Sequence, residues 1–130
     1  MRVLELRVAL TAEDFDSLVA FYRDGLGLEP GNTWTDHGQG QLFHSGKAVI
    51  EFLDKEHAAH VDAIEVGQQV SGQIRFAFQV SDIYKAVENA RQYRATIVSE
   101  PTLTPWHDLN ARIESPDGLQ ITLFQVIQTE

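Results

Sequence analysis

Residues 6–14 read LRVALTAED, and residues 74–82, about 68 positions later, read IRFAFQVSD. In both copies every second side chain is apolar, which is the pattern of a β-strand with one buried face. A hydroxyl residue and an aspartate follow each apolar run, where helices commonly begin. The two copies therefore indicate a duplicated module in which a strand leads into a helix.

The rest of each copy continues the repeat. Apolar residues at helical spacing follow in residues 15–22 and 83–90. Each helix precedes three strand-like segments, which are residues 27–34, 39–44 and 47–53, and then residues 96–99, 109–115 and 119–126. The sequence therefore predicts an α+β fold of two tandem β-α-β-β-β modules, residues 1–66 and 72–130, in a single domain. The polar link, residues 55–72, is expected to lie outside the core.

Composition narrows the class of protein. The chain of 130 residues is 43% hydrophobic and carries a formal net charge of −9, which opposes binding to nucleic acid or to an anionic membrane. It contains no cysteine, so disulfides, thiolate zinc sites and a cysteine nucleophile are excluded. No apolar run approaches the length of a membrane span, and residues 1–5 do not resemble a signal peptide. We expect a cytoplasmic protein.

Each of these strands also has a second face that carries polar residues, and these second faces predict a shared concave surface. If the helices cover the apolar faces, the opposite faces of the first and last strands of both modules converge. On the third strand of the first module, Leu42 and His44 are expected to face the helices. The expected lining of the concave surface is Arg7, Ala9, Val49, Glu51, Leu53, Arg75, Ala77, Gln79, Gln120, Thr122 and Phe124, extended by Phe43, Arg112 and Glu114.

Four segments in this order resemble the vicinal oxygen chelate superfamily, which includes glyoxalase I, bleomycin-resistance proteins, fosfomycin-resistance enzymes and extradiol dioxygenases. They are FYRDGLGL at 21–28, AVIEF at 48–52, FAFQVSD at 76–82, and the run from EP at 100–101 through PW at 105–106 to SPDGL at 115–119. The resemblance covers nearly the whole chain. It implies a single glyoxalase-like domain whose paired modules form an incomplete barrel around a concave cleft, and it implies a homodimer.

Metal-dependent members of that superfamily place ligands on the first and last strands of both modules. Those positions here are Arg7, Glu51, Arg75 and Thr122. Arginine is permanently cationic and has no lone pair to offer, so only Glu51 is an ordinary ligand. We therefore expect no metal and no cofactor. Either the three charged residues form a structural ion-pair network between the modules, or one arginine remains free to anchor a ligand carboxylate, phosphate or phenolate.

Aromatic residues near the expected cleft have two interpretations: they sandwich a flat ligand, or the tryptophans among them are core anchors. Trp106 and His107 precede a strand at what the resemblance implies is the cavity mouth, Trp34 occupies the equivalent region of the first module, and Phe43 and Phe124 extend the inner face. His57 and His60, in the link, are interpreted as a solvated surface pair. The expected ligand-binding residues are Arg7, Glu51, Arg75, Thr122, Phe43, Trp106, His107 and Phe124.

Three functions remain open. The leading one is metal-independent binding, or sequestration, of a small organic molecule, as in bleomycin-resistance proteins. The second is a glyoxalase- or dioxygenase-type enzyme with a displaced metal site, in which Glu51 acts with His107 or Glu5. The third is a non-catalytic structural or regulatory module whose cleft is filled by side chains.

Overall fold

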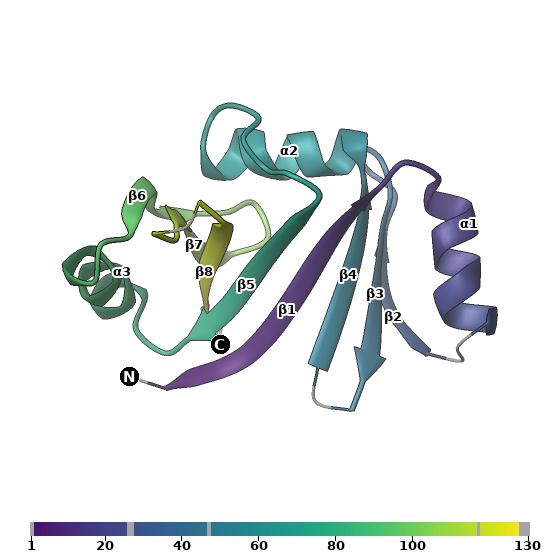
Figure 1. Cartoon of the computed structure of the whole chain (residues 1–130), viewed down its shortest axis with the longest axis horizontal. Coiled ribbons are helices and arrows are strands. Elements are labelled where there is room, and N and C mark those ends of the chain that lie inside the picture. Colours follow the sequence, from purple (N-terminus) through teal and green to yellow (C-terminus); the bar gives the residue numbers. More distant parts are fainter. Residues whose placement is uncertain (1, 26–27, 47, 117, 128–130) are drawn as a thin grey trace.

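The computed structural model describes residues 2–25, 28–46, 48–116 and 118–127, and the described residues form one open, eight-stranded sheet with helices on both faces (Figure 1). The first half contains β1 (Val3–Ala12), α1 (Phe15–Ala20), the π-helical turn η1 (Phe21–Gly25), β2 (Glu29–Trp34), β3 (Gly40–Ser45) and β4 (Ala48–Asp54). Helix α2 (Lys55–Glu65) connects it to β5 (Ile74–Val80), α3 (Ile83–Gln92), β6 (Thr96–Leu103), β7 (Asp108–Glu114) and β8 (Gln120–Val126).

The strand order, β2-β3-β4-β1-β5-β8-β7-β6, shows the duplication directly. In each half the first strand is parallel to the last, so that β1 pairs with β4 and β5 pairs with β8. The halves join where β1 and β5 run antiparallel, with Arg7 opposite Ala77 and Ala9 opposite Arg75. The predicted α+β fold of two β-α-β-β-β units is confirmed.

Helices α1 and α3 cover the two ends of the outer face. Helix α1 packs on a core that contains Val19, Phe43 and Phe52, and α3 contributes Ile83 and Val87 to a second core. Each helix begins after an aspartate whose carboxylate accepts a backbone N–H of the first turn. Between the helices the outer face stays open, because Leu4, Leu6 and Ile74 are 40–46% exposed. The expected helix cover therefore reaches only the ends of the sheet.

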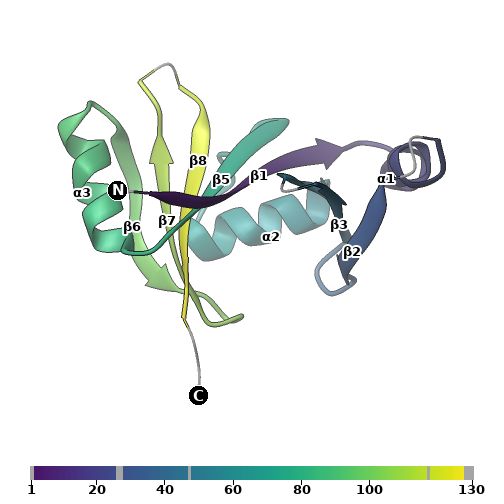
Figure 2. The same cartoon turned by 90° about the horizontal axis from the view of Figure 1, so that it is seen from below.

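The link was expected outside the core, and this was wrong. Helix α2 crosses the sheet between its two halves (Figure 2), and Ala58, Val61, Asp62 and Glu65 on it are buried. Its acidic side chains contact the inner face, opposite to the face that α1 and α3 cover. The polarity of the link did not predict its burial, because its buried carboxylates have partners on the sheet.

The expected facing of β3 was also wrong by one residue. Phe43 lies opposite Ile50 and shares the outer core with it, whereas Leu42 lies opposite Glu51 on the inner face. Directly paired residues share a face, so His44, opposite Val49, also faces inward. On β7 the expectation held, since Arg112 and Glu114 lie opposite Thr122 and Gln120 of the inner face.

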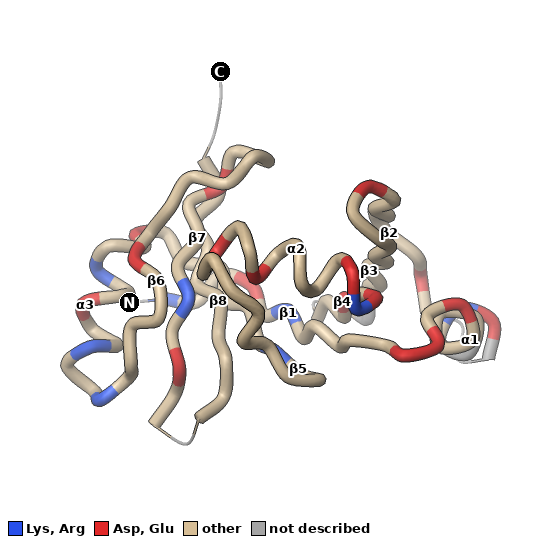
Figure 3. Tube along the Cα trace, turned by 90° about the horizontal axis from the view of Figure 1, so that it is seen from above, with Lys and Arg blue, Asp and Glu red and all other residues tan. Residues whose placement is uncertain are grey.

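Acidic positions are spread over both halves of the fold, including α1 and α2 (Figure 3). None of the helices in the described residues is long and apolar enough to cross a membrane.

Candidate functional site

A cavity of about 580 Å³ opens on the concave face. Strands of both halves, α2 and the turns after β2 and β6 form its wall. Most of the expected ligand-binding residues line it, and these are Arg7, Glu51, Arg75, Thr122, Trp106 and Phe124. Phe43 does not, because it is fully buried in the core under α1. His107 does not either, because it is exposed on the turn before β7.

Glu51 lies between the two arginines of the first strands. Its carboxylate oxygens are 3.8 Å from Nη1 of Arg7 and 3.9 Å from Nη2 of Arg75, so both contacts are ion pairs longer than hydrogen bonds. Arg7 also donates from Nε to Glu5 at 2.9 Å, and its guanidinium lies 5.1 Å from the centre of the Phe124 ring. Both arginines thus have acidic partners, which favours the structural ion-pair interpretation.

These residues do not fit a divalent metal. Two permanent cations flank Glu51, and Glu5 already holds Arg7. The Thr122 hydroxyl accepts from Arg75 Nη1 and donates to Glu65, both at 2.8 Å. Within the part of the chain that the structure describes, no group of three or more histidines or carboxylates is arranged to hold a metal ion.

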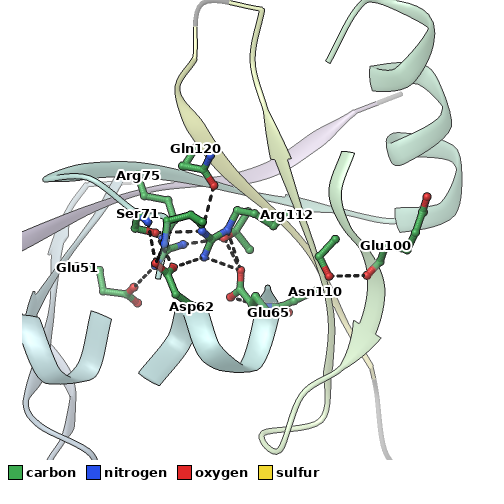
Figure 4. A network of polar contacts seen from close by, with 12 residues as sticks. Glu51, Asp62, Glu65, Ser71, Arg75, Glu100, Asn110, Arg112 and Gln120 are labelled. Carbon is green, nitrogen blue, oxygen red and sulfur yellow. Dashed lines mark hydrogen bonds and ion pairs between the residues drawn. The ribbon is translucent and has the colours of Figure 1, made fainter. Parts of the chain in front are cut away.

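Behind this wall, Arg112 forms a buried charge network that holds α2 on the sheet (Figure 4). Its guanidinium is fully buried and lies 2.9 Å from Asp62 and 3.1 Å from Glu65. It also donates to the Ser71 hydroxyl at 3.0 Å and to Gln120 at 3.3 Å. Two carboxylates against one guanidinium compensate its charge, so Arg112 is a structural residue that positions α2.

Asp62 and Glu65 anchor the helix end of this network. Burial alone would raise the pKa of Asp62, but hydrogen bonds from Ser71 and from the Val70 backbone, together with the charge of Arg112, lower it below 3.8. The other Glu65 oxygen accepts from Asn110 at 3.1 Å. Sequence reasoning missed both acids, because local polarity carries no sign of a partner located about 50 residues away.

Asn110, on the cavity wall, has an unmet hydrogen-bonding capacity. It is 6% exposed, and its amide nitrogen donates to Glu65. Its Oδ1 is buried and has no hydrogen-bond partner among the described residues. A buried acceptor without a donor is costly, so this atom lowers the stability of the folded protein.

Three histidines gather where the turn after β2 meets α2. The rings of His37 and His60 stack with centroids 3.9 Å apart, and His57 lies 5.9 Å from His60 and 6.0 Å from the Trp34 ring. Burial, with the nearby His37 and His57, lowers the pKa of His60 below 6.5, although Asp36 opposes this. All of these residues line the cavity, so the expected solvated pair is part of an aromatic edge of the site.

The turn after β6 forms the opposite edge. The backbone N–H of Asp108 donates to the Thr104 hydroxyl, and His107 occupies the left-handed region with a φ of 67°. Burial raises the pKa of the Asp108 carboxyl, while the charge of Arg7 and a hydrogen bond from Trp106 work against this rise. Trp106 and Asp108 line the cavity, and the exposed His107 shapes the turn.

Comparisons with known proteins agree with this architecture. Residues 6–123 match the family model described as Glyoxalase/Bleomycin resistance protein/Dioxygenase superfamily. The uncharacterized protein YraH of Bacillus subtilis (strain 168) is 25% identical over 98% of this chain and 100% of its own.

Solved structures show the same fold at low identity. A hypothetical protein, BH1468, from Bacillus halodurans C-125 superposes with a TM-score of 0.73 at 14% identity, covering 100% of this chain and 99% of its own. Methylmalonyl-CoA epimerase from Mycobacterium tuberculosis has a TM-score of 0.65 at 17% identity, covering 97% of this chain and 88% of its own.

Proposed function

The chain belongs to the glyoxalase/bleomycin resistance protein/dioxygenase superfamily, and on this premise we propose that it binds a small, flat organic molecule in the concave cavity without a metal ion. The observation that carries the proposal is the cavity itself. Its wall combines aromatic side chains with a carboxylate that is paired with two arginines, an arrangement unsuited to coordinating a metal ion. Its volume of about 580 Å³ lies within the range of small-molecule sites.

Aromatic groups from three elements of the cavity wall support a flat ligand. Trp34 ends β2, Trp106 lies on the turn after β6, and Phe124 lies on β8. Such rings bury large areas at little cost in conformational freedom. Binding in this manner, including sequestration, requires a shaped aromatic cleft and no reactive group.

The two other functions find less support. The displaced-metal enzyme needs Glu51 together with His107 or Glu5, but His107 is off the cavity wall and Glu5 is paired with Arg7. The module with a vestigial cleft would have its cavity filled by side chains. Although α2 occupies part of the concave face, a cavity large enough for a small molecule remains.

Binding can be tested without knowing the natural ligand. Protein treated with EDTA would be screened against uncharged, cationic and anionic bicyclic aromatic molecules, following fluorescence of Trp34 and Trp106 and backbone NMR shifts. We expect saturable binding with shifts confined to the cavity wall. Absence of binding by every probe, or binding that appears only after a divalent metal is restored, would refute the proposal.

Two substitutions of alanine by phenylalanine, one on the cavity wall and one away from it, test whether binding takes place in the cavity. Ala77 is 7% exposed on the cavity wall, so Ala77→Phe should fill the space and abolish binding. Ala63 is exposed on α2 away from the wall, so Ala63→Phe adds the same ring without effect on binding. Should Ala77→Phe fail to fold, Trp106→Ala, which removes a 45% exposed side chain, replaces it.

A further inference from the structure

We infer that the cavity selects flat organic cations, which it holds between two Trp-X-Asp turns; the inference rests on the proposed binding function and specifies its ligand class. Trp34-Thr35-Asp36 begins at the last residue of β2, and Trp106-His107-Asp108 lies after β6, the equivalent strand of the second half, and ends at the first residue of β7. Both tryptophans and both aspartates line the same cavity. The duplication thus brings an aromatic ring and a carboxylate to it from each side.

The fold fixes Trp34 in place. Trp34 lies opposite Gly40 on β3, and a Cβ atom at Gly40 would be 2.5 Å from Cε3 of the indole. The missing side chain therefore makes room for the ring. The turn that follows is attached to the start of α2, where Asp54 accepts the backbone N–H groups of Gln39 at 2.9 Å and His57 at 2.8 Å.

The second turn carries its own pair. Trp106 is 45% exposed, and both Trp106 and Asp108, two residues later, line the cavity. An indole face attracts a cation through its quadrupole, and an adjacent carboxylate adds a direct charge. A Trp-X-Asp turn therefore provides both groups that recognise a flat cation.

The charged side chains of the cavity wall also favour a cation, because carboxylates outnumber arginines. It carries Arg7 and Arg75 as cations, against four carboxylates, which are Asp36, Glu51, Glu65 and Asp108. Even when Glu65 is assigned to the buried Arg112, the carboxylates remain in excess. Arg7 and Arg75 are already paired with Glu5 and Glu51, so an anionic ligand would have to compete with these acids.

The test uses three bicyclic probes of similar size that differ in charge: N-methylquinolinium, quinoline and 2-naphthoate at pH 7.5. Affinities would be measured by tryptophan fluorescence and calorimetry in metal-free buffer. We expect the cation to bind at least about tenfold more tightly than the anion, and this preference to shrink as salt is added.

Charge variants assign the preference to the two turns. Asp36→Asn combined with Asp108→Asn keeps the shapes of the side chains and should weaken cation binding by about threefold to tenfold, while 2-naphthoate binds equally or better. Asp16→Asn, on the outer helix α1, removes a charge away from the wall and should change cation affinity by less than about twofold.

The possible outcomes separate the two proposals. If all three probes bind with similar affinity, or if 2-naphthoate binds best, the cation preference is wrong and the binding function stands. A double variant that behaves like Asp16→Asn also overturns the cation preference. If none of the probes binds to the wild-type protein, the proposed function fails, and the ligand class fails with it.

Discussion

Arg112 provides the sharpest test of how the fold is held together, because its charge is buried with two carboxylates. Arg112→Met keeps much of the side-chain volume but leaves Asp62 and Glu65 without their cation. Removing one partner of a buried ion pair costs about 3–5 kcal/mol. Asp62 keeps its hydrogen bonds from Ser71 and Val70, so we expect a loss near the lower end, about 3 kcal/mol.

Urea unfolding followed by tryptophan fluorescence and circular dichroism measures this loss. With an m value of about 2 kcal/mol/M, the midpoint should fall by about 1.5 M. Arg91→Met is the matched control, because Arg91 also pairs with two carboxylates, Glu88 and Glu100, but on the surface. Exposed pairs contribute at most about 1 kcal/mol, so that midpoint should move by less than about 0.5 M.

The pH dependence of the same variant has a defined sign. The pKa of Asp62 is lowered in the folded protein, so its stabilisation is present above the ordinary value of 3.8 and is lost as the pH falls through the lowered value. Without Arg112 the carboxylate protonates more readily in the folded state. The gap in stability between wild type and Arg112→Met should therefore narrow as the pH falls below 3.8. Equal losses in Arg112→Met and Arg91→Met would refute the assigned role of the network.

Three further outcomes follow from other contacts. The pKa of His60 is lowered, so the stability that His60 contributes is present above pH 6.5 and is lost as the pH falls. In urea titrations, His60→Gln should therefore lose less stability than wild type between pH 7.5 and 5. An equal loss in the two proteins would count against this. Gly40→Ala should displace Trp34 and change its fluorescence and probe affinity, whereas Gly72→Ala, with no atom within 4 Å of its Cβ position, should change neither. We propose that two chains pair through the exposed outer face around Leu6. Light scattering should then give about twice 14.6 kDa for wild type and the mass of one chain for Leu6→Lys. A monomeric wild type would contradict the proposed dimer.

The alternation of residues was enough to predict the frame of the molecule. It identified the first and last strands of both halves and placed Arg7, Glu51, Arg75 and Thr122 on a common inner face, where the cavity now lies. One face of each of these strands is apolar over most of its length, so the alternation was enough to orient them. The duplicated pattern supplied the order of elements.

Where both faces of a strand mix apolar and polar residues, alternation does not show which face is turned to the core. On β3, Gln41, Leu42 and Phe43 are all buried, and only the pairing of Phe43 with Ile50 shows which side each one faces. The same limit hid α2, whose Asp62 and Glu65 look solvated in the sequence. Their partner Arg112 lies 50 and 47 residues away, and no local pattern encodes that contact.

The site itself was predictable in part. Both tryptophans were recognised as aromatic residues of equivalent loops, and the Trp-X-Asp repeat was visible in the printed sequence, although its meaning depended on both turns reaching one cavity. His37 could not be joined to His57 and His60 before α2 was known to meet the turn after β2. The unmet acceptor of Asn110 requires three-dimensional contacts to be seen at all.

Calorimetric titration of N-methylquinolinium into protein stripped of metal, repeated after addition of one equivalent of Zn²⁺, Mn²⁺ or Ni²⁺, examines metal-free binding most directly. We predict one binding site per chain, with the same affinity before and after each metal is added, and loss of that site in Ala77→Phe. Binding that appears only when a divalent metal is restored at one ion per chain would contradict the metal-free cavity.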